Sequence, residues 1–154
     1  MKLAAFFGPS NILINHSAGD KEQTLVDLCG RMALNLGLQN REALTRAILD
    51  REAIVSTGMG EGIAIPHAKC DQIKDLTLFF AKLEPAIPFD SPDGKDVDLV
   101  FLLSGPPEKT QEHVRLLAAL ARFLQKPSLR ESLRAAGTLE EVIECLNRAE
   151  RDDS

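Results

Sequence analysis

The stretch GEGIAIPHAK, residues 60–69, decides the interpretation of this chain, because it joins closely spaced glycines to a short β-branched run that leads into Pro66 and His67. Isoleucine-rich runs favour strands, and proline cannot donate a ladder hydrogen bond, so the run predicts a strand that ends at or near Pro66. His67 would then stand at a strand end, where α/β sheets usually present their functional side chains. A lone histidine in such a setting is more often structural than catalytic. Other features of the sequence must therefore decide whether His67 has a packing role or a chemical role.

The segments around this stretch predict helices on both sides of a block of strands. Asp20 and Gln23 have the spacing of a capping box that begins a helix, and Gly37 ends its apolar pattern. Strands are expected at residues 11–16, 63–66, 75–84 and 98–104, and helices at 21–36, 40–53, 111–124, 127–136 and 139–150. This order predicts a single α/β domain over residues 1–154, a three-layer α/β/α sandwich with a mixed β-sheet.

The composition excludes several classes of function. The chain has 154 residues, of which 44% are apolar, and its net charge is −5 without a basic run, which argues against nucleic acid or an anionic membrane as the main partner. Cys29, Cys70 and Cys145 form no CxxC pair, which indicates reduced thiols rather than a disulfide framework. No run approaches the roughly 20 apolar residues of a membrane span. We therefore expect a cytoplasmic protein without direct membrane insertion.

The glycines Gly58, Gly60 and Gly62 raise the question of phosphate binding. Their pattern is GxGxG rather than GxGxxG, and it leads into a strand instead of a helix, so a nucleotide site is not expected. A glycine-rich turn can still form an anion nest for a phosphoryl group, with Thr57 as a hydroxyl donor or merely as a turn residue. His67 and Cys70 have a ligand-like spacing, but no second pair matches it, so no metal is expected.

Two further residues have competing interpretations. His113 is expected in the first turn of a helix that Thr110 would cap, either covering the apolar face or acting as a neutral donor to an anion. Arg51 is expected near a helix C-terminus, either interacting with the helix dipole or binding phosphate oxygens. His16, near the end of the first strand, has no comparable context and is expected to be a surface residue.

The segment REAIVSTGMGEGIAIPHAK, residues 51–69, resembles the active-site segment of the enzyme IIA domains of the bacterial phosphoenolpyruvate-dependent phosphotransferase system (PTS). The similar branch is the fructose/mannitol type, which includes the nitrogen-regulatory IIA proteins. The segment EHVRLLAALARFL, residues 112–124, is similar to the helix that carries the second active-site histidine of the family. The likeness extends over nearly the whole chain.

The resemblance implies that His67 is the phosphoacceptor and that Arg51 and His113 stabilise the transferred group, with Thr57, Gly58, Gly60 and Gly62 lining the site. It implies no metal, nucleotide or other cofactor. The implied donor is a phosphocarrier protein, HPr or nitrogen-HPr. An apolar patch beside the site, with Met59 in it, is expected to dock the carrier.

Three functions remain open at this point. The chain could be a regulatory IIA protein that acts on potassium-transport regulators or sensor kinases. It could instead be the IIA component of a fructose- or mannitol-type permease, which passes the phosphoryl group to a IIB cysteine. The third alternative is a protein-binding module that no longer carries phosphate, which an intact His67, Arg51 and His113 argue against.

Overall fold

The structure of the protein is a computed structural model, in which residues 2–153 are described. The strands are β1 (Ile12–His16), β2 (Gly58–Gly60), β3 (Ile63–Ala64), β4 (His67–Lys69), β5 (Thr77–Ile87) and β6 (Val97–Gly105). The helices are η1 (Leu3–Phe6), α1 (Lys21–Leu36), α2 (Arg41–Ile54), η2 (Pro107–Lys109), α3 (Thr110–Leu124), α4 (Pro127–Ala135) and α5 (Leu139–Asp153), of which η1 and η2 are short 3₁₀ helices. None of the helices within these residues is long and apolar enough to cross a membrane.

The strands form one mixed sheet in the order β1-β5-β6-β3-β2, with β4 also paired to β6. The pairs β1/β5, β3/β6 and β4/β6 are parallel, whereas β5/β6 and β2/β3 are antiparallel. The central strand β6 is buried along most of its length, as its nearly continuous apolar sequence predicts. The mixed sheet of the predicted fold class is therefore confirmed.

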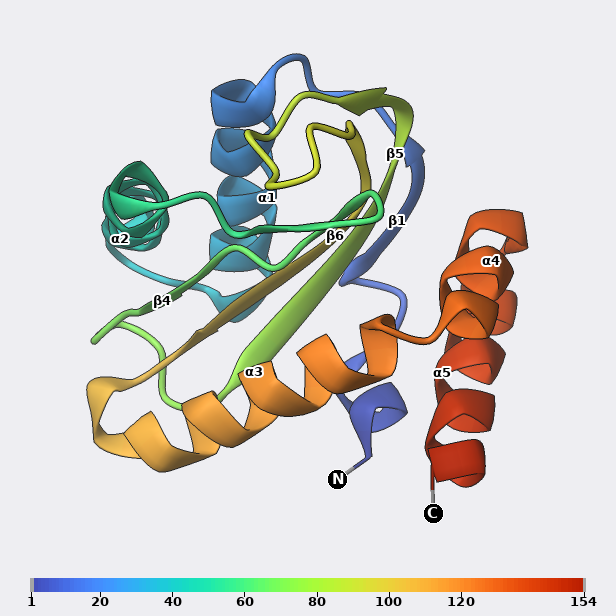
Figure 1. The fold of residues 1–154 in the computed structure, drawn as a ribbon. Helices are drawn as coiled ribbons and strands as arrows, with labels where there is room; N and C mark the ends of the chain where they lie inside the picture. Colours follow the sequence, from blue (N-terminus) through green and yellow to red (C-terminus); the bar gives the residue numbers. More distant parts are fainter. Residues whose placement is uncertain (1, 154) are drawn as a thin grey trace.

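Helices cover both faces of the sheet and give it the predicted three layers (Figure 1). Alternate side chains of a strand point to opposite faces, and the two cores follow this alternation. Phe80 and Phe101 pack on the face covered by α3, α4 and α5, with their ring centroids 4.6 Å apart. Phe79 and Leu102 pack on the opposite face, against α1 and α2. Two separate apolar cores thus hold the sheet between the helix layers.

Local signals set several helix ends. The predicted capping box of α1 is present, with Asp20 accepting from the Gln23 N–H and the Gln23 side chain accepting from the Asp20 N–H. The buried Lys82 of β5 donates hydrogen bonds to the carbonyls of Leu133, Arg134 and Ala136 at the C-terminus of α4. The lysine therefore satisfies carbonyls that lack a partner inside the helix.

The segment around the glycines differs from the prediction. The expected strand over 63–66 is interrupted. β3 ends at Ala64, Ile65 and Pro66 belong to no strand, and β4 begins at His67. Both pieces run beside β6, with Ile63 opposite Leu99 and His67 opposite Leu103. His67 thus begins a strand rather than ending one, but it still lies near the carboxyl end of β6, where α3 follows.

Candidate functional site

One hollow of about 520 Å³ collects three of the residues that the sequence indicated. Arg51 reaches it from α2, His67 from β4 and His113 from α3. The remaining lining residues are Ala47, Ala68, Lys69, Val114 and Leu117. The hollow therefore combines cationic and imidazole groups with an apolar wall.

The ring of His67 is held in one orientation by its own backbone. Nδ1 lies 2.8 Å from the carbonyl oxygen of Ile65, two residues earlier. Because a carbonyl oxygen can only accept, Nδ1 carries the proton of the neutral ring and donates it to Ile65. Nε2 then keeps its lone pair, and it has no hydrogen-bond partner within residues 2–153. The geometry leaves Nε2 as the ring nitrogen with a free lone pair.

The surroundings favour the neutral form of His67. Partial burial is the largest cause and lowers its pKa, while the Ile65 hydrogen bond raises it. The charge of Arg51 lowers the pKa further, and that of Glu52 raises it. The net direction is downward, so the ring is uncharged at neutral pH, which is the state that a nucleophile requires.

His113 is buried more deeply than the sequence suggested, with 4% of the residue exposed. Its ring lies edge-on to that of His67, with centroids 5.9 Å apart and planes at 61°. Its Nδ1 is buried without a hydrogen-bond partner, and burial, followed by His67 and Lys69, lowers its pKa. A buried nitrogen without a partner is costly, so this atom is able to form a hydrogen bond with a group that enters the hollow.

The expected cap of α3 is corrected. Thr110 is the first residue of α3 and its hydroxyl donates to the carbonyl of Pro107, while Lys109 occupies the capping position without a side-chain bond. His113 nevertheless lies in the first turn, as expected. The first turn of this helix is therefore adjacent to the hollow.

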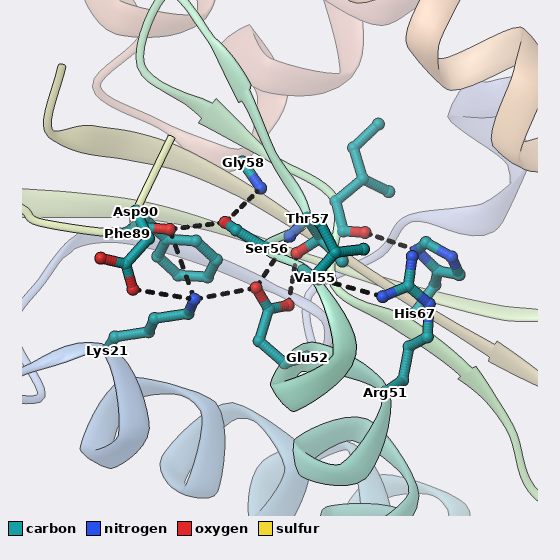
Figure 2. Close-up of polar contacts among 11 residues, drawn as sticks. Lys21, Arg51, Glu52, Val55, Ser56, Thr57, Gly58, His67, Phe89 and Asp90 are labelled. Carbon is teal, nitrogen blue, oxygen red and sulfur yellow. Dashed lines mark hydrogen bonds and ion pairs between the residues drawn. The ribbon is translucent and has the colours of Figure 1, made fainter. Parts of the chain in front are cut away.

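Arg51 lies in the last turn of α2, and its Nη1 donates to the carbonyl of Val55 at 3.0 Å (Figure 2). This is the helix C-terminus contact that the sequence predicted as one of two alternatives. A guanidinium carries five N–H donors, and this contact uses one of them. The others remain available to oxygen atoms in the hollow.

Thr57 is hydrogen-bonded to Glu52, a residue that we did not predict from the sequence to belong to the site. Its N–H and its hydroxyl donate to the two carboxylate oxygens of Glu52, at 2.8 and 2.6 Å (Figure 2). Ser56 donates to the carbonyl of Phe89 at 2.6 Å. Thr57 is not among the residues that line the hollow, so its predicted contact with phosphate stays a prediction. The only feature of the sequence that could have indicated Glu52 as a site residue is its position next to Arg51.

The glycines lie in a β-hairpin that contacts another loop. Gly60 and Gly62 have φ angles of 91° and 80°, a region that favours glycine. The Glu61 N–H between them donates to the carboxylate of Asp93 at 2.8 Å. Gly58 packs closely on Ser91. None of the three glycines lines the hollow, so their predicted phosphate binding also stays a prediction.

His16 is not the free surface residue that we expected. Its Nε2 lies 2.6 Å from the Asp27 carboxylate of α1, and its side chain is largely buried. The partner comes from the packing of α1 beside the strand end, which no local pattern indicates. Within the described part of the chain, no group of three or more His, Cys, Asp or Glu residues could hold a metal ion.

Comparison with known proteins identifies the family of this chain. The model of the family "Phosphoenolpyruvate-dependent sugar phosphotransferase system, EIIA 2" matches residues 5–149. A nitrogen regulatory protein of Bradyrhizobium diazoefficiens is 34% identical over 95% of this chain and 95% of its own length. The fructose-specific EIIABC component of Bacillus subtilis is 29% identical over 98% of this chain, which spans 24% of that larger protein.

The fold is also similar to that of a solved structure. The crystal structure of the nitrogen regulatory protein IIA-Ntr from Neisseria meningitidis superposes with a TM-score of 0.87, at 31% identity, over 94% of this chain and 98% of that one. The sequence match, the sheet order and the histidine pair in the hollow point in the same direction. The chain therefore belongs to the EIIA 2 family of the phosphoenolpyruvate-dependent sugar phosphotransferase system.

Proposed function

We propose that the protein carries a phosphoryl group on Nε2 of His67, which it accepts from a phosphocarrier protein, HPr or nitrogen-HPr. The observation that carries this proposal is the Nδ1–H bond to Ile65, because it orients the ring and leaves the Nε2 lone pair toward the hollow. A neutral imidazole is a good nucleophile at neutral pH.

In the proposed step, the Nε2 lone pair forms a bond to the phosphorus as the bond between phosphorus and the carrier's histidine nitrogen breaks. The departing nitrogen keeps the electron pair, so no external oxidant, reductant or metal is needed. Phosphoryl transfer requires mainly positioning and stabilisation of the charged oxygens. Free N–H donors of Arg51 and the buried ring of His113 lie where they could supply that stabilisation.

We assign a regulatory role as the first choice. Its support is the 34% identity to a nitrogen regulatory protein over nearly the full length of both chains, together with the IIA-Ntr structural match. In this role, phosphorylation of His67 would change binding to cytosolic proteins such as potassium-transport regulators or sensor kinases. The addition of two negative charges at the hollow gives such partners a large electrostatic difference to recognise.

The sugar-transport alternative also has a specific observation. The 29% identity to the fructose-specific EIIABC component favours a IIA protein that passes its phosphoryl group to a IIB cysteine. Mixing the phosphorylated protein with a fructose-type IIB domain separates the two roles. Rapid transfer to the IIB cysteine supports the transport role, while retention of the phosphoryl group on His67 supports the regulatory role.

The test of the shared proposal is phosphorylation in vitro. Incubation with phosphoenolpyruvate, the first PTS enzyme and a phosphocarrier should add one acid-labile, base-stable phosphoryl group, seen by intact mass. His67→Ala should take up none. Normal labelling of His67→Ala would remove the assignment of His67, and absence of labelling in the wild type would favour the binding-module alternative.

A further inference from the structure

Glu52 is a buried carboxylate beside the hollow that takes no part in the proposed chemistry. Its side chain is 6% exposed. It follows Arg51 directly in α2, yet the two side chains point to opposite sides, Arg51 toward His67 and Glu52 toward Lys21 (Figure 2). A buried carboxylate is costly unless it is paired and hydrogen-bonded, so its contacts indicate what it holds in place.

The contacts of Glu52 join three segments of the chain. Its two oxygens accept the N–H and the hydroxyl of Thr57, which belongs to the turn after α2. Its Oε2 also lies 2.9 Å from Nζ of Lys21, the first residue of α1. Lys21 in turn donates to the carbonyl of Phe89 at 3.3 Å. The pair therefore anchors the turn to α1 and to the loop before β6.

This anchoring acts on Arg51 through the backbone. The turn that Glu52 holds at Thr57 contains Val55, whose carbonyl accepts the hydrogen bond from Nη1 of Arg51. If the turn moves, the acceptor of Arg51 moves with it. A displacement of about 1 Å of a charged group at a reaction centre can cost about 10²-fold in rate.

Lys21 reduces but does not cancel the repulsion between Glu52 and an incoming phosphoryl group, since the charge of Glu52 still raises the pKa of His67. Lys21 pairs with the carboxylate on the side away from the hollow. The charged and titratable groups around His67 are then Arg51 and Glu52 from α2, Lys69 from β4 itself and His113 from α3. Of these, Arg51 lowers the pKa of His67 and Glu52 raises it.

We propose that Glu52 and Lys21 form a positioning pair, which clamps the turn of residues 55–57 and so holds the guanidinium of Arg51 in place for phosphoryl transfer to His67. This inference rests on the proposed function. Glu52 touches neither the carrier nor the reacting nitrogen, so it acts through Arg51. The pair adds to the site two residues that do not line the hollow.

The first test replaces the carboxylate without changing its shape. Glu52→Gln should lower the single-turnover rate of phosphorylation about 10-fold to 100-fold while the carrier concentration at half-maximal rate stays unchanged. Asp27→Asn is the matched control, because it also converts an ion-paired carboxylate to an amide but lies outside the hollow. The control should transfer at the wild-type rate.

A double-mutant cycle tests whether Glu52 acts through Arg51. In an Arg51→Ala background, Glu52→Gln should have little further effect, because the group that it positions is already gone. Lys21→Met should slow transfer in the same way as Glu52→Gln. Thr57→Val should have a smaller effect in the same direction, since it removes one of the two hydrogen bonds to Glu52 and keeps the charge of Glu52. Lys21→Met and Thr57→Val provide the test if Glu52→Gln does not fold.

A spectroscopic readout separates this inference from the proposed function. The pKa of His67, followed by NMR in the absence of any carrier, should be lower in Glu52→Gln than in the wild type and unchanged in Asp27→Asn. Wild-type transfer rates in Glu52→Gln and Lys21→Met, or rate losses that add fully to that of Arg51→Ala, would overturn the positioning pair. A wild-type protein that takes up no phosphoryl group would overturn the proposed function, whatever the pKa of His67, whereas the outcomes above overturn the positioning pair in a protein that is phosphorylated.

Discussion

At the scale of single residues, His67 and His113 share one hollow but differ in what surrounds their nitrogens. The Nδ1 of His67 is bonded to Ile65, while the Nδ1 of His113 is buried with no partner. We therefore predict that His67 is the nucleophile and that His113 donates a hydrogen bond to the transferred group. An orphaned N–H donor gains most from an oxygen that arrives during the reaction, because its desolvation has already been incurred.

We predict that His113→Ala remains folded and is phosphorylated on His67 about 10²-fold more slowly, the usual cost of one preorganised donor. Burial of His113 means that some stability is lost as well, so the rate must be measured on protein whose folded fraction is confirmed by circular dichroism. His16→Ala is the control, since it removes a paired histidine outside the hollow. A wild-type rate in His113→Ala would reduce His113 to a packing residue.

The lowered pKa values also predict how stability depends on pH. Burial lowers the pKa of both His67 and His113 from the ordinary 6.5, so near and below that pH the unfolded chain binds protons more tightly than the folded one. The unfolding free energy should therefore fall as the pH drops through this range, until both forms are protonated. Thermal unfolding between about pH 7.5 and 5.5 measures the slope. A double variant, His67→Gln with His113→Gln, should have a smaller slope, and equal slopes would contradict the prediction.

Residues with a local or motif signal could be predicted from the sequence, and residues with distant partners could not. The glycine-to-histidine stretch indicated His67, and Arg51 and His113 followed from segments similar to a known family. Glu52 and its partner Lys21 are far apart in the chain, so no spacing rule joins them. His16 was predicted wrongly for the same reason, because Asp27 reaches it only after α1 packs.

At the scale of elements, the C-terminus of α4 depends on one buried side chain from the sheet. Lys82 donates to three carbonyls at that end of the helix. We predict that Lys82→Met costs about 2 to 3 kcal/mol in unfolding free energy, the usual range for hydrogen bonds to a charged group. Urea denaturation measures the loss, with Lys109→Met on an exposed lysine as the control. An unchanged denaturation midpoint for Lys82→Met would show that the contacts do not stabilise α4.

Local patterns agree with the starts of three helices: Asp20 with Gln23 caps α1, Asn40 caps α2 and Pro127 begins α4. The Thr110 cap expected for α3 was wrong, because Lys109 occupies that position. The strand pieces around Pro66 could not be divided correctly from propensity alone. Their pairing is set by β6, which lies far along the chain, and by the absence of an N–H on proline. The hairpin of β2 and β3 was also not predicted, since Gly58, Gly60 and Gly62 indicated only a glycine-rich turn.

At the scale of the whole molecule, we predict that a carrier docks on apolar side chains beside the hollow. Val114 lines the hollow and is 58% exposed. Ile54 and Val55, at the end of α2, are exposed as well, and Met59 is 37% exposed rather than buried as filler. Apolar side chains around a reactive centre suit a transient protein contact. Whether Met59 belongs to that contact stays a prediction.

We predict that Val114→Asp weakens carrier binding, seen as a raised carrier concentration at half-maximal rate with little change in the maximal rate, because it alters docking more than chemistry. Leu34→Asp on α1 is the matched control, since Leu34 is 59% exposed and lies outside the hollow. Met59→Asp tests the extent of the same surface. Equal effects of Val114→Asp and Leu34→Asp would indicate general destabilisation instead of a docking surface.

The proposed phosphoryl transfer depends on which ring nitrogen of His67 receives the phosphoryl group. The hydrogen bond from Nδ1 of His67 to Ile65 leaves only Nε2 free. The most direct measurement is a long-range ¹H–¹⁵N NMR spectrum of the ¹⁵N-labelled protein before and after phosphorylation by the carrier. We predict that the phosphoryl group is found on Nε2 of His67, with the Nδ1 proton still bonded. A phosphoryl group on Nδ1 of His67, or on either ring nitrogen of His113, would contradict transfer to Nε2 of His67.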